Sequence, residues 1–253
     1  RGANGIVMIT TKTGKRNKPT VVDFSTGYSI QSVTKKMKLM NPQQYATLYN
    51  EQAANDNLAP YFTKAQIDSF GLMAGTDWQD LVLRNAPLSN TSVTVSGGSD
   101  KTRFSLSSGV YLQDGIVRNS SYKRYSVRGS IDHDISKVFN ISYNATLTRI
   151  GGQEQNSALG NRGSDLISAM LMAPPTLSPY LEDGSYRRLT TAYPFISNAI
   201  INPMIPIYET SNKLKRDRVF TNAALTIKPF DGLSIRISGG LVNIDDRRDN
   251  YTN

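Results

Sequence analysis

The side chain most able to do chemistry is a single histidine between two acids. His133 lies between Asp132 and Asp134, an arrangement that suggests a metal ligand or a general base. However, the chain has one histidine and no cysteine, and one histidine cannot make a zinc site with ordinary ligands. His133 also lies at the end of an expected strand beside a turn, so we expect a structural or solvated role for it.

Two pairs of adjacent acids are weaker candidates for catalysis. Glu182 is followed by Asp183, and Asp245 by Asp246. On a strand, adjacent side chains point to opposite faces, so neither pair is suited to act as paired carboxylates. We expect both pairs in solvated loops. The sequence shows no nucleophile–base set, which argues against an enzyme, including an enzyme built on a β-barrel.

Basic residues and one tryptophan could bind a partner instead. The chain has 29 Lys and Arg against 20 Asp and Glu, a formal net charge of +9. These cations are scattered, without the motifs or stacking platforms of nucleic-acid binding, so no nucleic-acid partner is expected. Trp78 suggests a sugar-stacking platform, but its helical spacing with Leu81 and Val82 favours packing inside a loop. No cofactor and no metal ligands are predicted, and no substrate-binding residue can be named.

Stretches of alternating residues must position these groups. Residues 91–113 contain two such runs, joined by Gly97-Gly98-Ser99-Asp100. Glycine accepts the positive φ of a hairpin turn, and apolar residues recur at every second position in both runs. The stretch therefore predicts a β-hairpin whose strands have two unlike faces.

Similar runs predict seven two-faced strands in all. The connections between them are in turn long, short, medium, short, long and short, so every second one is tight. This asymmetry is typical of an antiparallel up-and-down meander and of outer-membrane barrels. The expected strands lie near residues 20–31, 91–96, 102–113, 122–132, 139–148, 219–227 and 233–241.

The two long connections, residues 33–89 and 151–216, are expected to contain helical insertions. In the second, Ser164 is expected to cap a short helix that Pro174 and Pro175 end. In the first, an N-cap followed by proline and two capping-box patterns predict helix starts. These starts are Asn41-Pro42, Thr63 with Gln66, and Thr76 with Gln79.

Composition leaves two architectures open. A transmembrane helix is excluded because the sequence has no run of about 18 apolar residues. A transmembrane β-barrel is compatible, because barrel strands alternate and need only about ten residues. The alternative is a soluble glycan-binding or adhesive β-sandwich, which alternates in the same way. Small polar residues on one face and unpaired sheet edges favour the barrel.

Several short segments, in order along the chain, carry a resemblance to a known family. The chain resembles the SusC/RagA family of TonB-dependent outer-membrane transporters over essentially all of its 253 residues. Residues 1–12 look like the end of the family's plug domain, and residues 75–80 like a motif in its first outer loop. The other matching segments are residues 86–87, 96–103, 113–116, 123–125, 173–174, 183–186 and 202–203.

The resemblance implies a domain division and a function. Residues 1–15 would be the last plug strand, and residues 16–253 the first part of a barrel of roughly 22 strands, with outer loops 33–89 and 151–216. It implies TonB-dependent import of oligosaccharides or peptides across the bacterial outer membrane, with a SusD-like surface lipoprotein as partner. No segment that contacts TonB is recognised in this sequence. Which substrate is carried, which oligomer forms and whether this part folds alone do not follow from the sequence.

If loops 33–89 and 151–216 face outward, as the resemblance implies, four basic runs lie in outer loops or at outer strand ends. We expect outer-membrane lipid as a partner of the wall, and the phosphates of lipopolysaccharide as partners of some of these cations, with solvated loop charge as the alternative. Tyr125 and Tyr143 have the apolar parity and are expected to face lipid or lie in an aromatic girdle. The basic runs are residues 35–38, 187–188, 213–218 and 247–248.

Overall fold

The protein is one antiparallel sheet with a helical body at one end. The computed structural model describes residues 14–155 and 160–252, and the expected plug strand of residues 1–15 lies outside them except for residues 14 and 15. Seven strands pair in sequence order, which confirms the predicted meander. The strands are β1 (Lys18–Gln31), β2 (Ala86–Gly98), β3 (Thr102–Asp114), β4 (Ser121–Asp134), β5 (Phe139–Gln153), β6 (Thr210–Ile227) and β7 (Ile235–Thr252).

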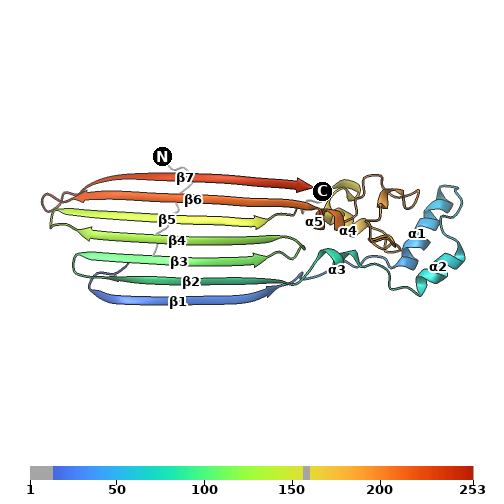
Figure 1. The fold of residues 1–253 in the computed structure, drawn as a ribbon, viewed down its shortest axis with the longest axis horizontal. Coiled ribbons are helices and arrows are strands. Elements are labelled where there is room, and N and C mark those ends of the chain that lie inside the picture. Colours follow the sequence, from blue (N-terminus) through green and yellow to red (C-terminus); the bar gives the residue numbers. More distant parts are fainter. Residues whose placement is uncertain (1–13, 156–159, 253) are drawn as a thin grey trace.

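Connections of different length separate the two ends of the sheet (Figure 1). Tight turns join β2 to β3 and β4 to β5 at one end, here called the turn end, and the connection of residues 228–234 joins β6 to β7 there. The long connections of residues 32–85 and 154–209 and a short one of residues 115–120 lie at the other end, the loop end. Every strand in the described part of the chain belongs to this sheet, so no second sheet covers the 139–147 face as a sandwich would require.

The last two strands are longer than the alternation indicated. β6 begins at Thr210 and β7 extends to Thr252. The second loop is therefore shorter than the predicted residues 151–216, and the basic run 213–218 lies within β6. Charged side chains interrupt the apolar alternation there, which hid the strand in the sequence; backbone pairing with β5 and β7 continues through them.

Short helices occupy the two long loops, as expected. Asn41 caps α1, and its side chain accepts from the Gln44 backbone N–H while the Gln44 side chain accepts from the Asn41 N–H. Thr63 and Gln66 form the same reciprocal box at α2. Among the described residues, no helix is long and apolar enough to cross a bilayer. The helices are α1 (Pro42–Asn55), α2 (Lys64–Gly71), α3 (Trp78–Val82), α4 (Leu166–Met172) and α5 (Met204–Tyr208), with single 3-10 turns at Asn161–Gly163 and Leu189–Thr191.

Two predicted caps are wrong by one residue. The N-cap of α3 is Asp77, not Thr76: its carboxylate accepts from the N–H groups of residues 79 and 80 at 2.9 and 3.2 Å. A carboxylate at a helix N-terminus also gains from the helix dipole, which a threonine lacks. The N-cap of α4 is Asp165, not Ser164, with Ser168 completing the box. The expected end of α4 is confirmed, because Ala173 and the prolines after it leave the helix.

The hydrophobic core lies in the loops. Helices α3, α4 and α5 pack together and bury a continuous apolar cluster drawn from both long loops, so the two loops form one body (residues 32–85 and 154–209), here called the loop body. Its buried members are Trp78, Val82, Leu166, Ala169, Met170, Ala173, Leu189, Ile200, Met204 and Ile207.

Trp78 connects the two loops directly. Its side chain is only 2% exposed, and its indole Nε1–H donates to the Pro174 carbonyl oxygen at 2.9 Å. The neighbouring Gln79 side chain both accepts from the Met37 N–H and donates to the Met37 carbonyl, each at 2.9 Å. The predicted packing role of Trp78 is therefore confirmed, and its ring is too buried to stack on a sugar.

Replacing Trp78 by Phe in the intact protein should loosen the loop body and leave the sheet unchanged. The variant keeps an apolar ring but loses the indole hydrogen bond to the Pro174 carbonyl, which keeps only the Leu177 N–H at 3.2 Å, a loss of about 1 kcal/mol. Hydrogen exchange in detergent should become faster in α3 and α4 and stay unchanged in β3–β5. Leu72→Ala is the control, because Leu72 is 91% exposed in the same loop. Equal protection in the variant and the wild type would contradict the role of this contact.

Candidate membrane interface and loop body

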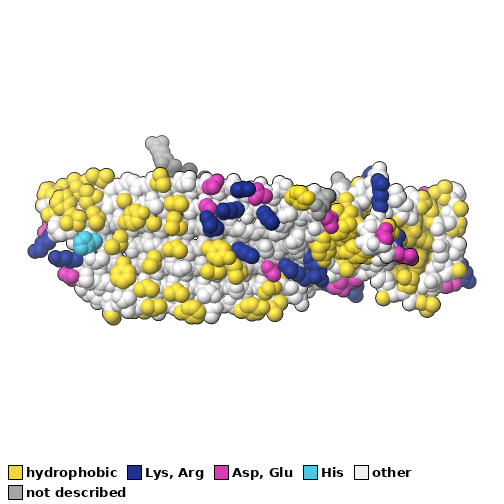
Figure 2. Space-filling view, in the orientation of Figure 1, with side chains coloured by type: hydrophobic (Ala, Val, Ile, Leu, Met, Phe, Trp, Pro, Cys, Tyr) yellow, Lys and Arg dark blue, Asp and Glu magenta, His cyan; other side chains and the backbone are white. Residues whose placement is uncertain are grey.

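One face of the sheet is apolar near the turn end. Strand pairing places the apolar parity of every strand on the same side, here called the apolar face (even-numbered residues in β1 and β3, odd-numbered residues in the others). Figure 2 shows this face, which carries the single histidine. Its large exposed side chains include Val22, Phe24, Tyr28, Ile30, Val93, Leu106, Leu112, Tyr125, Val127, Ile131, Phe139, Ile141, Tyr143, Leu147, Ile235, Ile237 and Leu241.

The apolar band crosses the strands obliquely. One register row links Val22 of β1 to Leu241 of β7, each residue facing its neighbour across all seven strands. Leu241 is the last apolar residue of the band on β7, whereas on β1 the band continues past Val22 to Ile30. The limit of the band on the side of the loop end therefore shifts by eight residues across six strand spacings.

This shift gives the angle between the strands and the band. With about 3.3 Å per residue and about 4.8 Å between strands, eight residues over six spacings correspond to a tilt of roughly 40–45°. Strands of outer-membrane barrels are tilted by about 35–45° to the membrane normal. The band also spans residues 139–147 on β5, about 20 Å of height at this tilt, close to the apolar belt of such barrels. The geometry thus fits a membrane-spanning wall.

The opposite face, here called the polar face, has mostly small, hydroxylic and charged side chains. Hydrogen bonds connect strands across it: Thr94 Oγ1 of β2 donates to Ser107 Oγ of β3 at 3.1 Å, and Gln113 Nε2 of β3 reaches over β2 and donates to Gln31 Oε1 of β1 at 2.8 Å. The guanidinium of Arg124 lies 5.4 Å from the centre of the Tyr111 ring. These contacts suit a water-lined interior, as the alternation predicted.

A patch of exposed apolar side chains interrupts the polar face on the last two strands. Phe220 faces Val242 across the β6–β7 pair, and Ile244 follows two residues later on the same face. All three are about half exposed in this structure. The predicted last strand ends at Leu241, so the sequence pattern does not include Val242 or Ile244.

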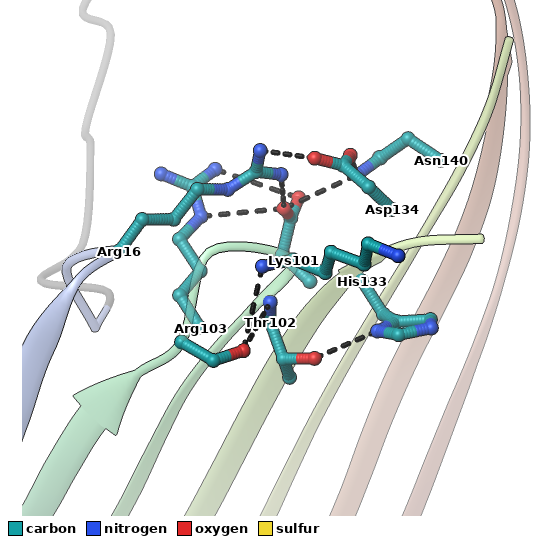
Figure 3. A network of polar contacts seen from close by, with 9 residues as sticks. Arg16, Lys101, Thr102, Arg103, His133, Asp134 and Asn140 are labelled. Atoms are coloured by element: carbon teal, nitrogen blue, oxygen red, sulfur yellow. Dashed lines mark hydrogen bonds and ion pairs between the residues drawn. The ribbon is translucent and has the colours of Figure 1, made fainter. Parts of the chain in front are cut away.

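A polar network closes the turn end of the polar face (Figure 3). Arg16, just before β1, reaches β4 and forms ion pairs with Asp134 and, at 3.0 Å, with Asp132. The Asn140 side chain donates to the same two carboxylates at 2.8 and 3.2 Å. Gly14 makes this approach possible, because a Cβ there would lie 2.1 Å from the Phe104 carbonyl oxygen.

His133 belongs to the other face and takes no part in this network. Its Nδ1 lies 2.7 Å from Thr102 Oγ1, its cross-strand neighbour (Figure 3). Asp132 and Asp134 point to the polar face, so the sequence neighbours do not form one site. The described residues contain no group of three or more His, Asp or Glu able to hold a metal ion. The histidine has the structural contact expected for it.

The two acidic pairs lie apart in the structure. Asp183 is in a loop, where hydrogen bonds from Ser185 lower the pKa of its carboxyl group. Asp245 and Asp246 lie inside β7 and point to opposite faces, so their expected loop location is wrong. Asp246 pairs with Arg216 across the β6–β7 ladder.

The predicted basic runs divide into loop contacts and strand residues. Lys36 forms an ion pair with Asp80 in the loop body, and this hydrogen bond lowers the pKa of the Asp80 carboxyl group. Arg187 Nε donates to the Ser178 carbonyl at 2.9 Å and fixes its own loop. The runs 213–218 and 247–248 lie on β6 and β7 near the loop end, where adjacent residues face opposite sides.

A cavity of about 410 Å³ opens between the two long loops. Its walls include Met37, Leu39, Tyr49 and Met172, and Asp77 is the one charged residue among those that line it. Beside it, Tyr49 and Phe195 stack with ring centres 3.9 Å apart, in a cluster that joins α1 to the second loop. The site is thus a hollow within the loop body whose walls are apolar, aromatic and polar in turn, with one carboxylate.

Curated relatives align with this chain along most of its length. The chain is 31% identical over 243 residues to TonB-dependent receptor P3 of Formosa agariphila, an alignment that covers 95% of the chain. The chain belongs to the SusC/RagA family of TonB-dependent receptors. It is also 24% identical over 187 residues to TonB-dependent receptor SusC of Bacteroides thetaiotaomicron, which covers 74% of the chain. No protein-family model matches the chain.

Solved structures agree on the SusC/RagA fold. The RagAB peptide transporter superposes with a TM-score of 0.78 over 99% of the chain at 20% identity, and the closed-closed RagAB peptide importer with 0.76 at 19% identity. The seven strands thus match part of the wall of an outer-membrane barrel in a transporter family, which is not a family of enzymes. The chain spans 22% of the length of P3, 17% of SusC and 31% of each of these two RagAB chains.

Arginine substitutions at adjacent residues of β5 should separate the two faces. Tyr143→Arg places a charge in the middle of the apolar band and should lower the free energy of unfolding in lipid vesicles by about 2–4 kcal/mol. Asn144→Arg adds the same charge on the polar face and should cost less than about 1 kcal/mol, as at other water-exposed sites. Denaturant titration of the intact receptor measures both. Equal losses, or a larger loss for Asn144→Arg, would show that the faces are assigned the wrong way round.

Proposed function

We propose that the protein acts as a TonB-dependent importer in the outer membrane, taking up oligosaccharides or peptides together with a SusD-like surface lipoprotein. The observation that carries this proposal is the oblique apolar band, which gives the sheet a membrane-crossing tilt and leaves the loop body beyond it. Family membership supports the same role. The similar RagAB structure is that of a peptide importer, which supports peptides as one class of cargo.

We propose the domain division predicted from the sequence, with residues 1–15 ending a plug and residues 16–253 forming part of the barrel. The packing of residues 14–17 supports this boundary. Gly14 packs closely against the β2–β3 hairpin, Asn17 N–H donates to the Ser99 carbonyl at 3.1 Å, and Arg16 pairs with β4. These contacts attach the chain to the wall on its polar face, where a plug would enter.

We propose the loop body as the contact surface for the lipoprotein and the cargo. Its outer surface carries large apolar side chains that a free surface would not favour. Met37 is 60% exposed and Met73 52% exposed, at or near the cavity between the loops. Methionine surfaces adapt to different partners, which suits a site that first holds a lid and then admits cargo. The near absence of charge in the cavity suits neutral sugars or uncharged peptide side chains.

We propose that the apolar face contacts outer-membrane lipid. The charged side chains between the apolar band and the loop end would contact lipopolysaccharide.

Uptake should depend on TonB. In cells that contain the intact receptor, accumulation of labelled oligosaccharide or peptide should fall to the background level when TonB is deleted, because energy reaches the outer membrane only from the inner one. The control is a cell that lacks the receptor. Accumulation that persists without TonB, in receptor-dependent form, would contradict active import.

Acidic substitutions on the loop body should release the lipoprotein. We expect the combined variant Met37→Asp, Leu39→Asp, Met73→Asp to lower the amount of lipoprotein recovered with the receptor about tenfold or more, because each carboxylate must lose water at the interface. Ile135→Asp is the matched control: Ile135 is 56% exposed but lies in a turn at the opposite end. Recovery that is unchanged in the triple variant, with the receptor still in the membrane, would exclude this surface.

A further inference from the structure

One register row changes from apolar to cationic as it crosses the sheet. It contains Tyr28, Ser89 and Leu112 on β1–β3, and then Lys123, Gly151, Lys215 and Arg247 on β4–β7. All seven lie on the apolar face. Because the band is oblique, the row leaves it between β3 and β4. The cations therefore lie on the lipid side of the wall, just above the apolar band, where Figure 2 shows charged side chains gathered near the loop end.

Two of these cations face each other directly. Lys215 and Arg247 are paired in the β6–β7 ladder, and like charges in that position destabilise a sheet. Arg247 has Asp249 as an ion-pair partner at 3.0 Å, whereas neither Lys215 nor Lys123 forms an ion pair within the described residues. An anion between them would remove this repulsion.

Gly151 leaves room for such an anion. It separates Lys123 from Lys215 in the row, and a Cβ at this position would meet only the Leu214 carbonyl oxygen, at 3.7 Å. Lys123 and Lys215 are two strand spacings apart, about 10 Å, so two extended lysines can reach one group between them. Lysine ammonium groups bind phosphate as point charges, and long basic side chains extend along apolar surface toward a polar layer.

The height above the apolar band identifies the kind of phosphate. Tyr125 is the last apolar residue of the band on β4. Lys123 lies two residues before it in the sequence, on the same face and nearer the loop end, about 5 Å above the band at this tilt. Lys215 lies about 10 Å above it on β6. This interval is the polar headgroup layer of a bilayer, not bulk water.

We infer that Lys123 and Lys215, across Gly151, bind a phosphate group of an anionic glycolipid in the outer leaflet. The inference rests on the proposed membrane orientation and deepens it. It also narrows the sequence-based hypothesis for the run 213–218, because Lys213 and Lys215 point to the apolar face whereas Arg216 and Arg218 point to the polar face. Lys123 lies outside the four predicted basic runs. Acidic side chains border the site on the side nearer the apolar band. They are Asp217, which accepts from Arg149 at 2.7 and 2.9 Å, and Asp245, its neighbour on β7.

The test uses the intact receptor and two charge-reversal variants of equal charge. The first, Lys123→Glu with Lys215→Glu, reverses both proposed ligands. The control, Arg218→Glu with Arg236→Glu, makes the same charge change on the polar face of β6 and β7. Lipid A phosphate that remains with the purified receptor is measured by mass spectrometry. Thermal unfolding is measured in phosphatidylcholine vesicles, with and without an equal amount of lipid A.

The wild type and the control should retain lipid A and unfold at a higher temperature when it is present. The first variant should retain about tenfold less and show no such shift, because each reversed cation near an anionic surface changes the attraction severalfold. Equal retention in the first variant, or no retention by the wild type, overturns the inference. Displacement of lipid A by inorganic phosphate alone also overturns it, because the site would then hold a free ion. A wild type that is absent from the outer membrane would instead overturn the proposed function.

Discussion

The backbone ladder of the sheet is the constraint on which every other feature depends. Each strand pairs with the next over nearly its full length, and pairing fixes which side chains share a face. A slip of one residue in any pair would turn the apolar residues of that strand into the polar interior. In lipid such a slip would also leave polar side chains without hydrogen-bond partners, so the register is held by both faces together.

The oblique band connects this local constraint to the orientation of the whole sheet. Each strand leaves the apolar region at a different residue: Ile30 on β1, Tyr125 on β4 and Leu241 on β7. The shift is regular, and a flat layer crossed by tilted strands produces this pattern, whereas a protein partner with an irregular surface would not require it. A single membrane therefore accounts both for the apolar ends of the first strands and for the polar and charged ends of the later strands.

Local patterns in the sequence predicted what local forces determine. The seven strands, the tight turns after β2 and β4 and the caps at Asn41 and Thr63 depend on neighbours a few residues away, and they are confirmed. The caps at Asp77 and Asp165 were missed because two adjacent polar residues competed for each helix start, and only packing decides between them. Contacts between distant segments were beyond the sequence. Arg16 meets Asp132 and Trp78 meets Pro174 across about a hundred residues, and nothing in either segment indicates its partner.

The adjacent residues Lys215 and Arg216 show why charge composition alone is a poor guide to partners. They carry the same charge, yet Arg216 faces water and pairs with Asp246, whereas Lys215 faces the lipid side opposite another cation. A pair on the watery side is screened and contributes little to stability. A cation at the edge of hydrocarbon is screened less, so it needs an anion of its own. The location of each charge relative to the apolar band therefore decides which molecule it can bind.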